Sequence, residues 1–198
     1  MNKKLIVKDI FFDLDHTLWD FDKNSMLAFK RVFKKFKITI EFDAFLKIYE
    51  PINVEYWKKY REDKVSKENL RRGRLIDSFN FFDLIYSTEK IDEIADAYIQ
   101  ELPFDNHLFE GAVEILDYLI LKYKLHIITN GFEEVQHKKL KNSGIDHYFS
   151  TVTTSEEVGL KKPNPKVFLT ALNKANSLPN QSVMIGDSLE ADILGANN

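Results

Sequence analysis

Short apolar segments, each ending in polar residues, constrain the fold of this chain more than any other feature of its sequence. The first is residues 10–12, and three more lie at residues 126–130, 150–154 and 182–187. Apolar side chains recur at helical spacing over residues 110–123 and 167–175. Strands that alternate with helices predict an α/β fold with a Rossmann-like parallel sheet. A domain of this class normally adds a further strand after residues 191–196.

Residues 18–107 differ from the rest of the chain, because their apolar pattern is helical throughout. The expected helices begin near Asn24 or Ser25 and then cover residues 42–60, 67–82 and 90–101. We expect Ser66 to cap the third helix and Pro51 to break or kink the second. The predicted domains are therefore an α/β core, residues 1–17 and 108–198, and a helical insert, residues 18–107, large enough for a small bundle.

Composition excludes several classes of protein. The chain has no cysteine, which excludes a disulfide, a thiolate metal site and a thiol nucleophile. Its net charge of −3 gives no electrostatic case for a nucleic acid polymer as partner. No segment approaches the roughly 20 apolar residues that span a membrane, and Lys8 and Asp9 interrupt the first apolar stretch too early for a signal peptide. We expect a cytoplasmic protein with no membrane partner.

Polar side chains follow the expected strands, at or beyond the point where each one ends. They are Asp13 and Asp15, then Thr129, Asn130 and Gly131, then Lys162, and finally Asp187, Ser188 and Asp192. Because the carboxyl ends of neighbouring parallel strands meet at one edge of a sheet, we expect these groups to converge on a single site.

The chemistry of these groups is complementary. The carboxylates of Asp13 and Asp15 would repel each other unless a cation neutralises them or one stays protonated. Asp13, Asp187 and a backbone carbonyl near Asp15 offer the hard oxygen ligands that Mg²⁺ prefers. Thr129 and nearby backbone N–H groups could bind phosphate at the start of a helix, and Lys162 would add positive charge. Taken singly, each group also fits a turn, a helix cap or a solvated loop; their joint order favours phosphoryl transfer.

The four groups together resemble the four motifs of the haloacid dehalogenase-like hydrolase superfamily, and the match covers nearly the whole chain. The resemblance implies that Asp13 is a nucleophile that forms an aspartyl-phosphate. It implies that Asp15 is the general acid/base, whose backbone carbonyl also binds Mg²⁺. The insert is similar to the type 1 cap of this family.

The resemblance assigns the remaining groups as well. Thr129, with Asn130 and Gly131, corresponds to the phosphate-binding motif, and Lys162 to the motif lysine, since the family pairs this lysine with proline. Asp187 corresponds to a direct metal ligand, with Ser188 and Asp192 in support.

An acid at position 15 favours a phosphatase over a dehalogenase, because an alkoxide leaving group needs a proton and a halide does not. Residues 12–25, 70–77 and 155–159 resemble the bacterial house-cleaning pyrimidine 5′-nucleotidases of this superfamily. The implied substrate is a nucleoside monophosphate, and the implied assembly a monomer or homodimer. A phosphatase or phosphomutase acting on a sugar phosphate or phosphoglycolate stays open, as does a degenerate member that only binds a ligand.

Four residues of the insert are candidates for substrate specificity. Trp19 and Phe21 follow the first motif directly, and could stack on a base or pack under the insert. Asn24 could contact substrate or cap a helix, and Arg72 could face a cleft or solvent.

Overall fold

The structure is a computed structural model, and it describes residues 6–198. The chain divides into two compact units. Unit 1 contains the chain up to Lys23 together with Asn106–Asn198, and unit 2 is Asn24–Asp105. The boundaries predicted from the sequence lie at residues 17/18 and 107/108. None of the helices described within residues 6–198 has the length and apolar character needed to cross a membrane.

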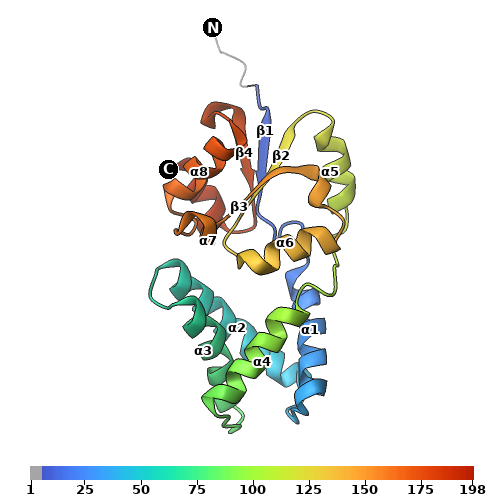
Figure 1. Ribbon diagram of the computed structural model, residues 1–198, viewed down its shortest axis with the longest axis vertical. Coiled ribbons are helices and arrows are strands. Elements are labelled where there is room, and N and C mark those ends of the chain that lie inside the picture. Colours follow the sequence, from blue (N-terminus) through green and yellow to red (C-terminus); the bar gives the residue numbers. More distant parts are fainter. Residues whose placement is uncertain (1–5) are drawn as a thin grey trace. The chain divides into compact units, whose positions relative to one another are not determined.

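Unit 1 is built on a parallel sheet of four strands (Figure 1). The strands are β1 (Asp9–Phe12), β2 (Lys124–Thr129), β3 (Phe149–Thr154) and β4 (Ser182–Ile185). Their order across the sheet is β3-β2-β1-β4. In this register Phe12 lies level with Ile127 and Ile185, so the strands end at nearly the same edge. The predicted α/β class with a parallel sheet is confirmed.

Helices cover the sheet of unit 1. The main ones are α5 (Ala112–Ile120), α6 (Glu133–Asn142) and α8 (Pro165–Ala175), with α5 and α8 on either side of the strands (Figure 1). Shorter segments are α7 (Ser155–Val158), η1 (Asp146–Tyr148), η2 (Pro179–Gln181), the π-helix η3 (Leu189–Leu194) and α9 (Gly195–Asn197). Strand side chains alternate between faces, and Phe11 and Ile128 pack against Val167 and Ala171 of α8.

The segment after β1 is held to unit 1 by backbone hydrogen bonds. Leu18 and Trp19 both donate their N–H groups to the carbonyl of Leu14, at 3.0 and 2.9 Å. The N–H of Phe109 donates to the carbonyl of Leu18 at 3.0 Å, and Trp19 is fully buried. These bonds explain why unit 1 extends beyond residue 17.

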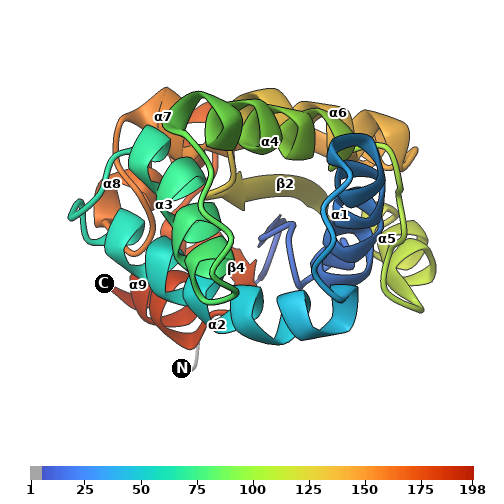
Figure 2. The ribbon, with the colours of Figure 1, turned by 90° about the horizontal axis from the view of Figure 1, so that it is seen from below.

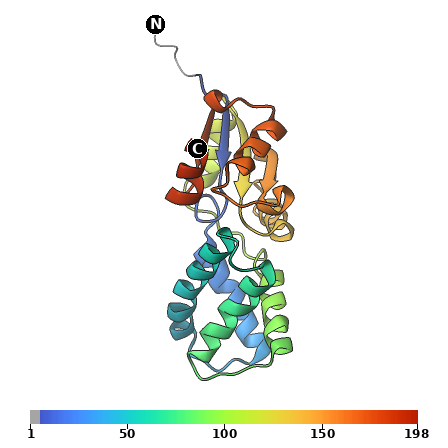
Figure 3. The ribbon, with the colours of Figure 1, turned by 90° about the vertical axis from the view of Figure 1, so that its left-hand side faces the viewer.

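Unit 2 consists of helices, which begin with α1 (Phe21–Phe36) and continue with α2 (Phe42–Arg61), α3 (Lys67–Asn80) and α4 (Thr88–Glu101). α2 packs along α3, and α3 against α4 (Figures 2 and 3). Phe29 lies at the centre of their core, with its ring centroid 4.6 Å from that of Tyr49 and 4.1 Å from that of Tyr98. Ser66 caps α3 as predicted, since its side chain accepts from the N–H of Asn69.

The predicted start of the first helix was wrong, and so was the predicted break of the second helix at Pro51. α1 already begins at Phe21, where the side chain of Asp20 accepts from the N–H of Lys23, so Asn24 and Ser25 are buried inside the helix rather than capping it. Pro51 lies inside α2 without ending it. Buried side chains on both sides of the proline, such as Tyr49 and Tyr60, outweigh the lost backbone hydrogen bond.

Phe29→Ala tests the role of this aromatic core. Removing a fully buried phenylalanine leaves a cavity, and we expect a loss of about 3–5 kcal/mol in the free energy of unfolding. The measurement is urea denaturation followed by circular dichroism. Phe81→Ala is the matched control, because that ring is 63% exposed and its loss should change stability by less than about 0.5 kcal/mol. Similar losses in both variants would contradict a core centred on Phe29.

Candidate active site

Asp13 lies directly beyond β1, where its N–H still donates to the carbonyl of Ile185 on β4 at 2.9 Å. The strand ends at Phe12, so both aspartates lie beyond it, and Asp15 is in a turn in which the N–H of Thr17 donates to the carbonyl of Leu14. His16, in the same turn, has a positive φ of 60°. Asp13 and Asp15 consequently have different partners, although side chains two residues apart in a strand would share one side.

Lys162 is the buried centre of the first set of contacts. Its Nζ donates to Asp13 Oδ1 at 2.6 Å, to Asp192 Oδ1 at 2.6 Å and to the carbonyl of Ile128 at 2.8 Å. A lysine ammonium has three N–H donors, so these bonds use all of them. The side chain is 2% exposed, so the ammonium group is shielded from solvent.

Burial and neighbouring charges perturb this cluster. Burial raises the pKa of Asp13 to about 7, and the carboxylates of Asp192 and Asp15 add to the rise against the opposing effect of Lys162. Burial alone lowers the pKa of Lys162, but Asp13 and Asp192 more than reverse this and raise it. Partial burial also raises the pKa of Asp187. The cluster therefore holds more negative charge than its one ammonium group balances.

This donor set fits a divalent metal ion. Asp13, Asp187 and Asp192 each place a carboxylate oxygen within 4.8 Å of the others. Three carboxylates against the ammonium of Lys162 leave two unbalanced negative charges, and oxygen donors suit Mg²⁺. Asp192 already accepts from Lys162 and, through Oδ2, from the N–H of Ser188 at 3.1 Å. Asp187 is the exposed member, and its N–H donates to Thr17 Oγ1 at 3.1 Å.

The loop after β4 is shaped to admit Asp192. A Cβ on Gly186 would lie 2.2 Å from Asp192 Oδ2, so only glycine leaves room for this carboxylate. The side chain of Ser188 accepts from the N–H of Ala191 at 3.0 Å and so caps η3, the helix that carries Asp192. Ser188 thus supports the site through its backbone and cap.

The residues after β2 take different positions from one another. Thr129 is buried, and its Oγ1 accepts from the N–H of Gly131 at 3.0 Å. Asn130 binds the backbone of Lys162 twice, because its Oδ1 accepts from the N–H at 2.8 Å and its Nδ2 donates to the carbonyl at 3.0 Å. The amide of Asn130 therefore fixes the loop that carries Lys162.

Asp15 belongs to a second set of contacts, with two residues of α6 to which the sequence analysis gave no role. Lys139 Nζ donates to Asp15 Oδ1 at 2.5 Å, and Gln136 Nε2 donates to Asp15 Oδ2 at 3.0 Å. Both side chains are buried, and burial lowers the pKa of Lys139 despite the facing carboxylate. The sequence did contain a signal for these two residues. They lie on the same helix face as the apolar residues Val135 and Leu140, and polar side chains are rarely buried on such a face unless they have a partner.

The four specificity candidates lie in different surroundings. Trp19 is fully buried beneath Lys139, whose Nζ is 4.1 Å from its ring centroid, so it packs and has no face open to a base. Phe21 is half-buried beside Trp19. Asn24 is buried within unit 2. Arg72 donates to both carboxylate oxygens of Asp92, at 2.8 and 2.7 Å, so its guanidinium already has a charged partner.

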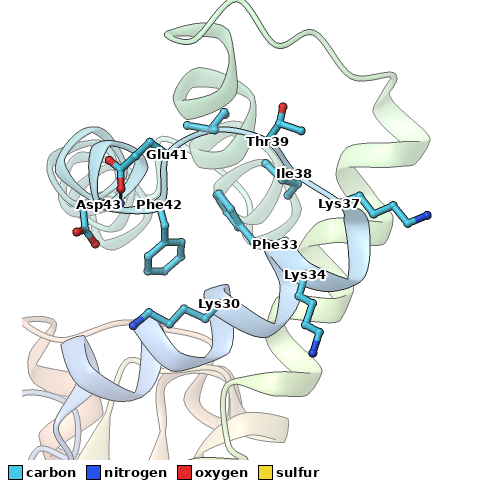
Figure 4. A pocket seen from close by; sticks show the side chains of 10 residues that line it. Lys30, Phe33, Lys34, Lys37, Ile38, Thr39, Glu41, Phe42 and Asp43 are labelled. Atoms are coloured by element: carbon cyan, nitrogen blue, oxygen red, sulfur yellow. Dashed lines mark hydrogen bonds between the residues drawn. The ribbon is translucent and has the colours of Figure 1, made fainter.

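A pocket of about 660 Å³ in unit 2 contains none of the candidate residues. The rings of Phe33 and Phe42 meet edge to face in it, with centroids 5.2 Å apart, while Lys34 and Lys37 point outward (Figure 4). This pocket has no carboxylate cluster or buried nucleophile of the kind found in unit 1, so the chemistry is assigned to unit 1.

Comparison with known proteins agrees with this geometry. The family model described as haloacid dehalogenase-like hydrolase matches residues 10–198. This chain belongs to the haloacid dehalogenase-like hydrolases. The resemblance stated from its sequence is confirmed, and so is the fold expected for that family.

Two phosphatases are similar to this protein over nearly its whole length. Pyrimidine 5′-nucleotidase YjjG of Escherichia coli is 34% identical over 96% of this chain and 81% of its own length. Glyceraldehyde 3-phosphate phosphatase of Methanothermobacter thermautotrophicus is 32% identical over 98% and 82%. The crystal structure of the putative hydrolase YfnB of Bacillus subtilis, bound to magnesium, superposes with a TM-score of 0.89 at 26% identity, over 97% of this chain and 85% of YfnB.

Asp13→Asn tests the charge imbalance of the cluster. Because the pKa of Asp13 rises from 3.8 to about 7 on folding, the folded protein binds the extra proton, and stability without a cation falls as pH rises across this range. Asparagine imitates the protonated acid and removes the dependence. In EDTA we expect the unfolding temperature of Asp13→Asn, minus that of wild type, to increase from pH 4 to pH 8.

Mg²⁺ should reduce this difference at pH 8, because a bound cation stabilises the ionised wild-type site. Asp146→Asn, a change at an exposed acid outside the cluster, is the control and should show neither effect. A difference that does not vary with pH would contradict the assigned imbalance.

Proposed function

We propose that this protein is a Mg²⁺-dependent phosphomonoester hydrolase that works through an aspartyl-phosphate on Asp13, with nucleoside monophosphates, in particular pyrimidine ones, as substrates. The observation that carries the proposal is the division of the two aspartates. Asp13 is buried against Lys162, and Asp15 is held separately by α6. A nucleophile and a separate acid/base are what this two-step hydrolysis requires.

In the first step, Asp13 attacks phosphorus in line, and the bond from phosphorus to the leaving oxygen breaks. Asp15 gives that oxygen its proton, which an alkoxide needs in order to depart. Lys162 holds the Asp13 carboxylate through Oδ1, which leaves the other oxygen for the attack. The hydroxyl of Thr129 donates to a phosphoryl oxygen.

In the second step, Asp15 has become a base and takes a proton from water. The resulting hydroxide attacks the phosphorus of the aspartyl-phosphate, and the bond from phosphorus to Asp13 breaks to release inorganic phosphate. The protons balance, since Asp15 returns to its acid form and Asp13 to its carboxylate.

Asp13 and Asp187, with the backbone carbonyl of Asp15, would hold the magnesium ion, and Asp192 would support it. The ion supplies positive charge that offsets the charge of the phosphoryl oxygens. This assignment draws on the oxygen donors within 4.8 Å and on the magnesium-bound structure of YfnB.

The nucleotide assignment draws on the similarity to the pyrimidine 5′-nucleotidase at 34% identity. A phosphatase of triose phosphates is the second candidate, because the glyceraldehyde 3-phosphate phosphatase is 32% identical over an equal span. Both candidates use the same residues of unit 1, so the substrate alone separates them.

Asp13→Asn tests the nucleophile directly. An amide cannot form the aspartyl-phosphate, so we expect kcat to fall by more than ~10³-fold while the protein stays folded. The measurement is phosphate release with Mg²⁺, alongside acid-quench detection of phosphoenzyme in wild type. Asp146→Asn serves again as control. Near-normal turnover by Asp13→Asn would overturn the mechanism.

A substrate panel tests the specificity. We expect kcat/KM for UMP and dTMP to exceed that for glyceraldehyde 3-phosphate, phosphoglycolate and sugar phosphates, with activity lost in EDTA and restored by Mg²⁺. A preference for glyceraldehyde 3-phosphate would favour the second candidate. No turnover of any substrate would indicate a binding protein.

A further inference from the structure

Gln136 is a buried residue of α6 that connects the two halves of the candidate active site. Its Nε2 donates to Thr129 Oγ1 at 2.6 Å and to Asp15 Oδ2 at 3.0 Å. A side-chain amide nitrogen has two hydrogens, so these two bonds use both of them. The orientation of the amide is fixed, because the carboxylate of Asp15 only accepts hydrogen bonds and must therefore face the NH₂ group of the amide.

This contact determines where the Thr129 hydroxyl can point. A hydroxyl has two acceptor positions and one O–H donor. The acceptor positions receive the N–H of Gly131 at 3.0 Å and the amide of Gln136 at 2.6 Å. The O–H proton is therefore directed away from both donors, free to donate to a bound anion.

The same contact restricts the Asp15 carboxylate. Gln136 holds Oδ2, while Lys139 holds Oδ1 at 2.5 Å and rests over the ring of Trp19. With a partner on each oxygen, the carboxyl group cannot rotate freely about its last bond. Each oxygen keeps a second lone pair, which can carry the proton that the leaving group needs.

Gly131 supplies independent support. A Cβ on this residue would lie 2.3 Å from Gln136 Nε2 and 2.5 Å from its Cδ. The backbone of Gly131 has no positive φ, so its conformation alone does not demand glycine. The space around Gly131 is therefore occupied by the amide of Gln136, and an alanine there would push this flexible side-chain end aside.

We infer that Gln136 is a positioning residue, which aligns the acid/base Asp15 and the phosphate-binding Thr129 with each other. This inference rests on the proposed function, because it assumes that Asp15 protonates a leaving group. It extends that function by adding α6 to the elements that build the site. Lys139 completes the arrangement by holding the second oxygen of Asp15.

The test compares two leaving groups in the variant Gln136→Ala. An alkyl phosphate, such as UMP, needs a proton from Asp15, whereas p-nitrophenolate departs from p-nitrophenyl phosphate as a stable anion. Misplacing a catalytic group lowers rates by about 10- to 100-fold. We expect this loss in kcat/KM for UMP and a loss at least about tenfold smaller for p-nitrophenyl phosphate. A purely structural role would lower both equally.

Three further variants make the comparison sharp. Thr129→Val removes the phosphate contact and the acceptor shared by Gly131 and Gln136, but it keeps the bond from Gln136 to Asp15, so it should lower kcat/KM for both substrates alike. His137→Ala, at the exposed neighbour on α6, should change neither. Gly131→Ala should reproduce the pattern of Gln136→Ala, and the double variant should be no worse than Gln136→Ala alone, because no amide is left to displace.

Equal losses on both substrates in folded Gln136→Ala, or unchanged activity, would overturn the inference. So would additive effects in the double variant. If UMP is not a substrate, the wild-type panel identifies an alkyl phosphate that is, and the comparison uses that ester. If the wild-type protein hydrolyses none of these esters, the proposed function itself is wrong.

Discussion

The buried ammonium group of Lys162 is the interaction on which the rest of the site depends. It joins three segments that are far apart in the sequence, since it binds Asp13, the carbonyl of Ile128 and Asp192. Breaking one partner of a buried ion pair leaves an uncompensated charge, which is strongly destabilising. This contact therefore requires β1, β2 and the helix after β4 to keep their register. Asn130 adds to this by holding the backbone of Lys162.

The turn after β1 lets one short segment supply two carboxylates with separate partners. Backbone N–H groups of Leu18 and Trp19 converge on the carbonyl of Leu14, and His16 adopts a positive φ. Asp13 consequently contacts Lys162, while Asp15 contacts Gln136 and Lys139. Each carboxylate has its own ammonium partner, which eases the repulsion expected of two acids so close in sequence.

The sequence predicted those parts of the structure that depend on neighbouring residues. The four strands and the capped helix at Ser66 come from apolar periodicity and side-chain capping, which are properties of neighbouring residues. Asn24 was misread because Asp20 is an earlier cap, and competing caps cannot be ranked without the packing that buries Asn24. Gln136 was missed because its role depends on Asp15, more than a hundred residues away, and on the space that Gly131 leaves.

The two charge clusters of unit 1 differ in a way that fits their proposed roles. Asp15 and Lys139 form a balanced pair, so no further cation is needed there. Around Lys162, three carboxylates face one ammonium, and burial, with the charges of Asp192 and Asp15 added to it, raises the pKa of Asp13 to about 7. A carboxyl group that is partly protonated at neutral pH is a weak nucleophile. A divalent ion at this cluster would lower that pKa and restore the carboxylate. In the proposed mechanism, the imbalance would therefore make the nucleophilicity of Asp13 depend on the metal ion, while the position of Asp15 as acid/base would depend on α6.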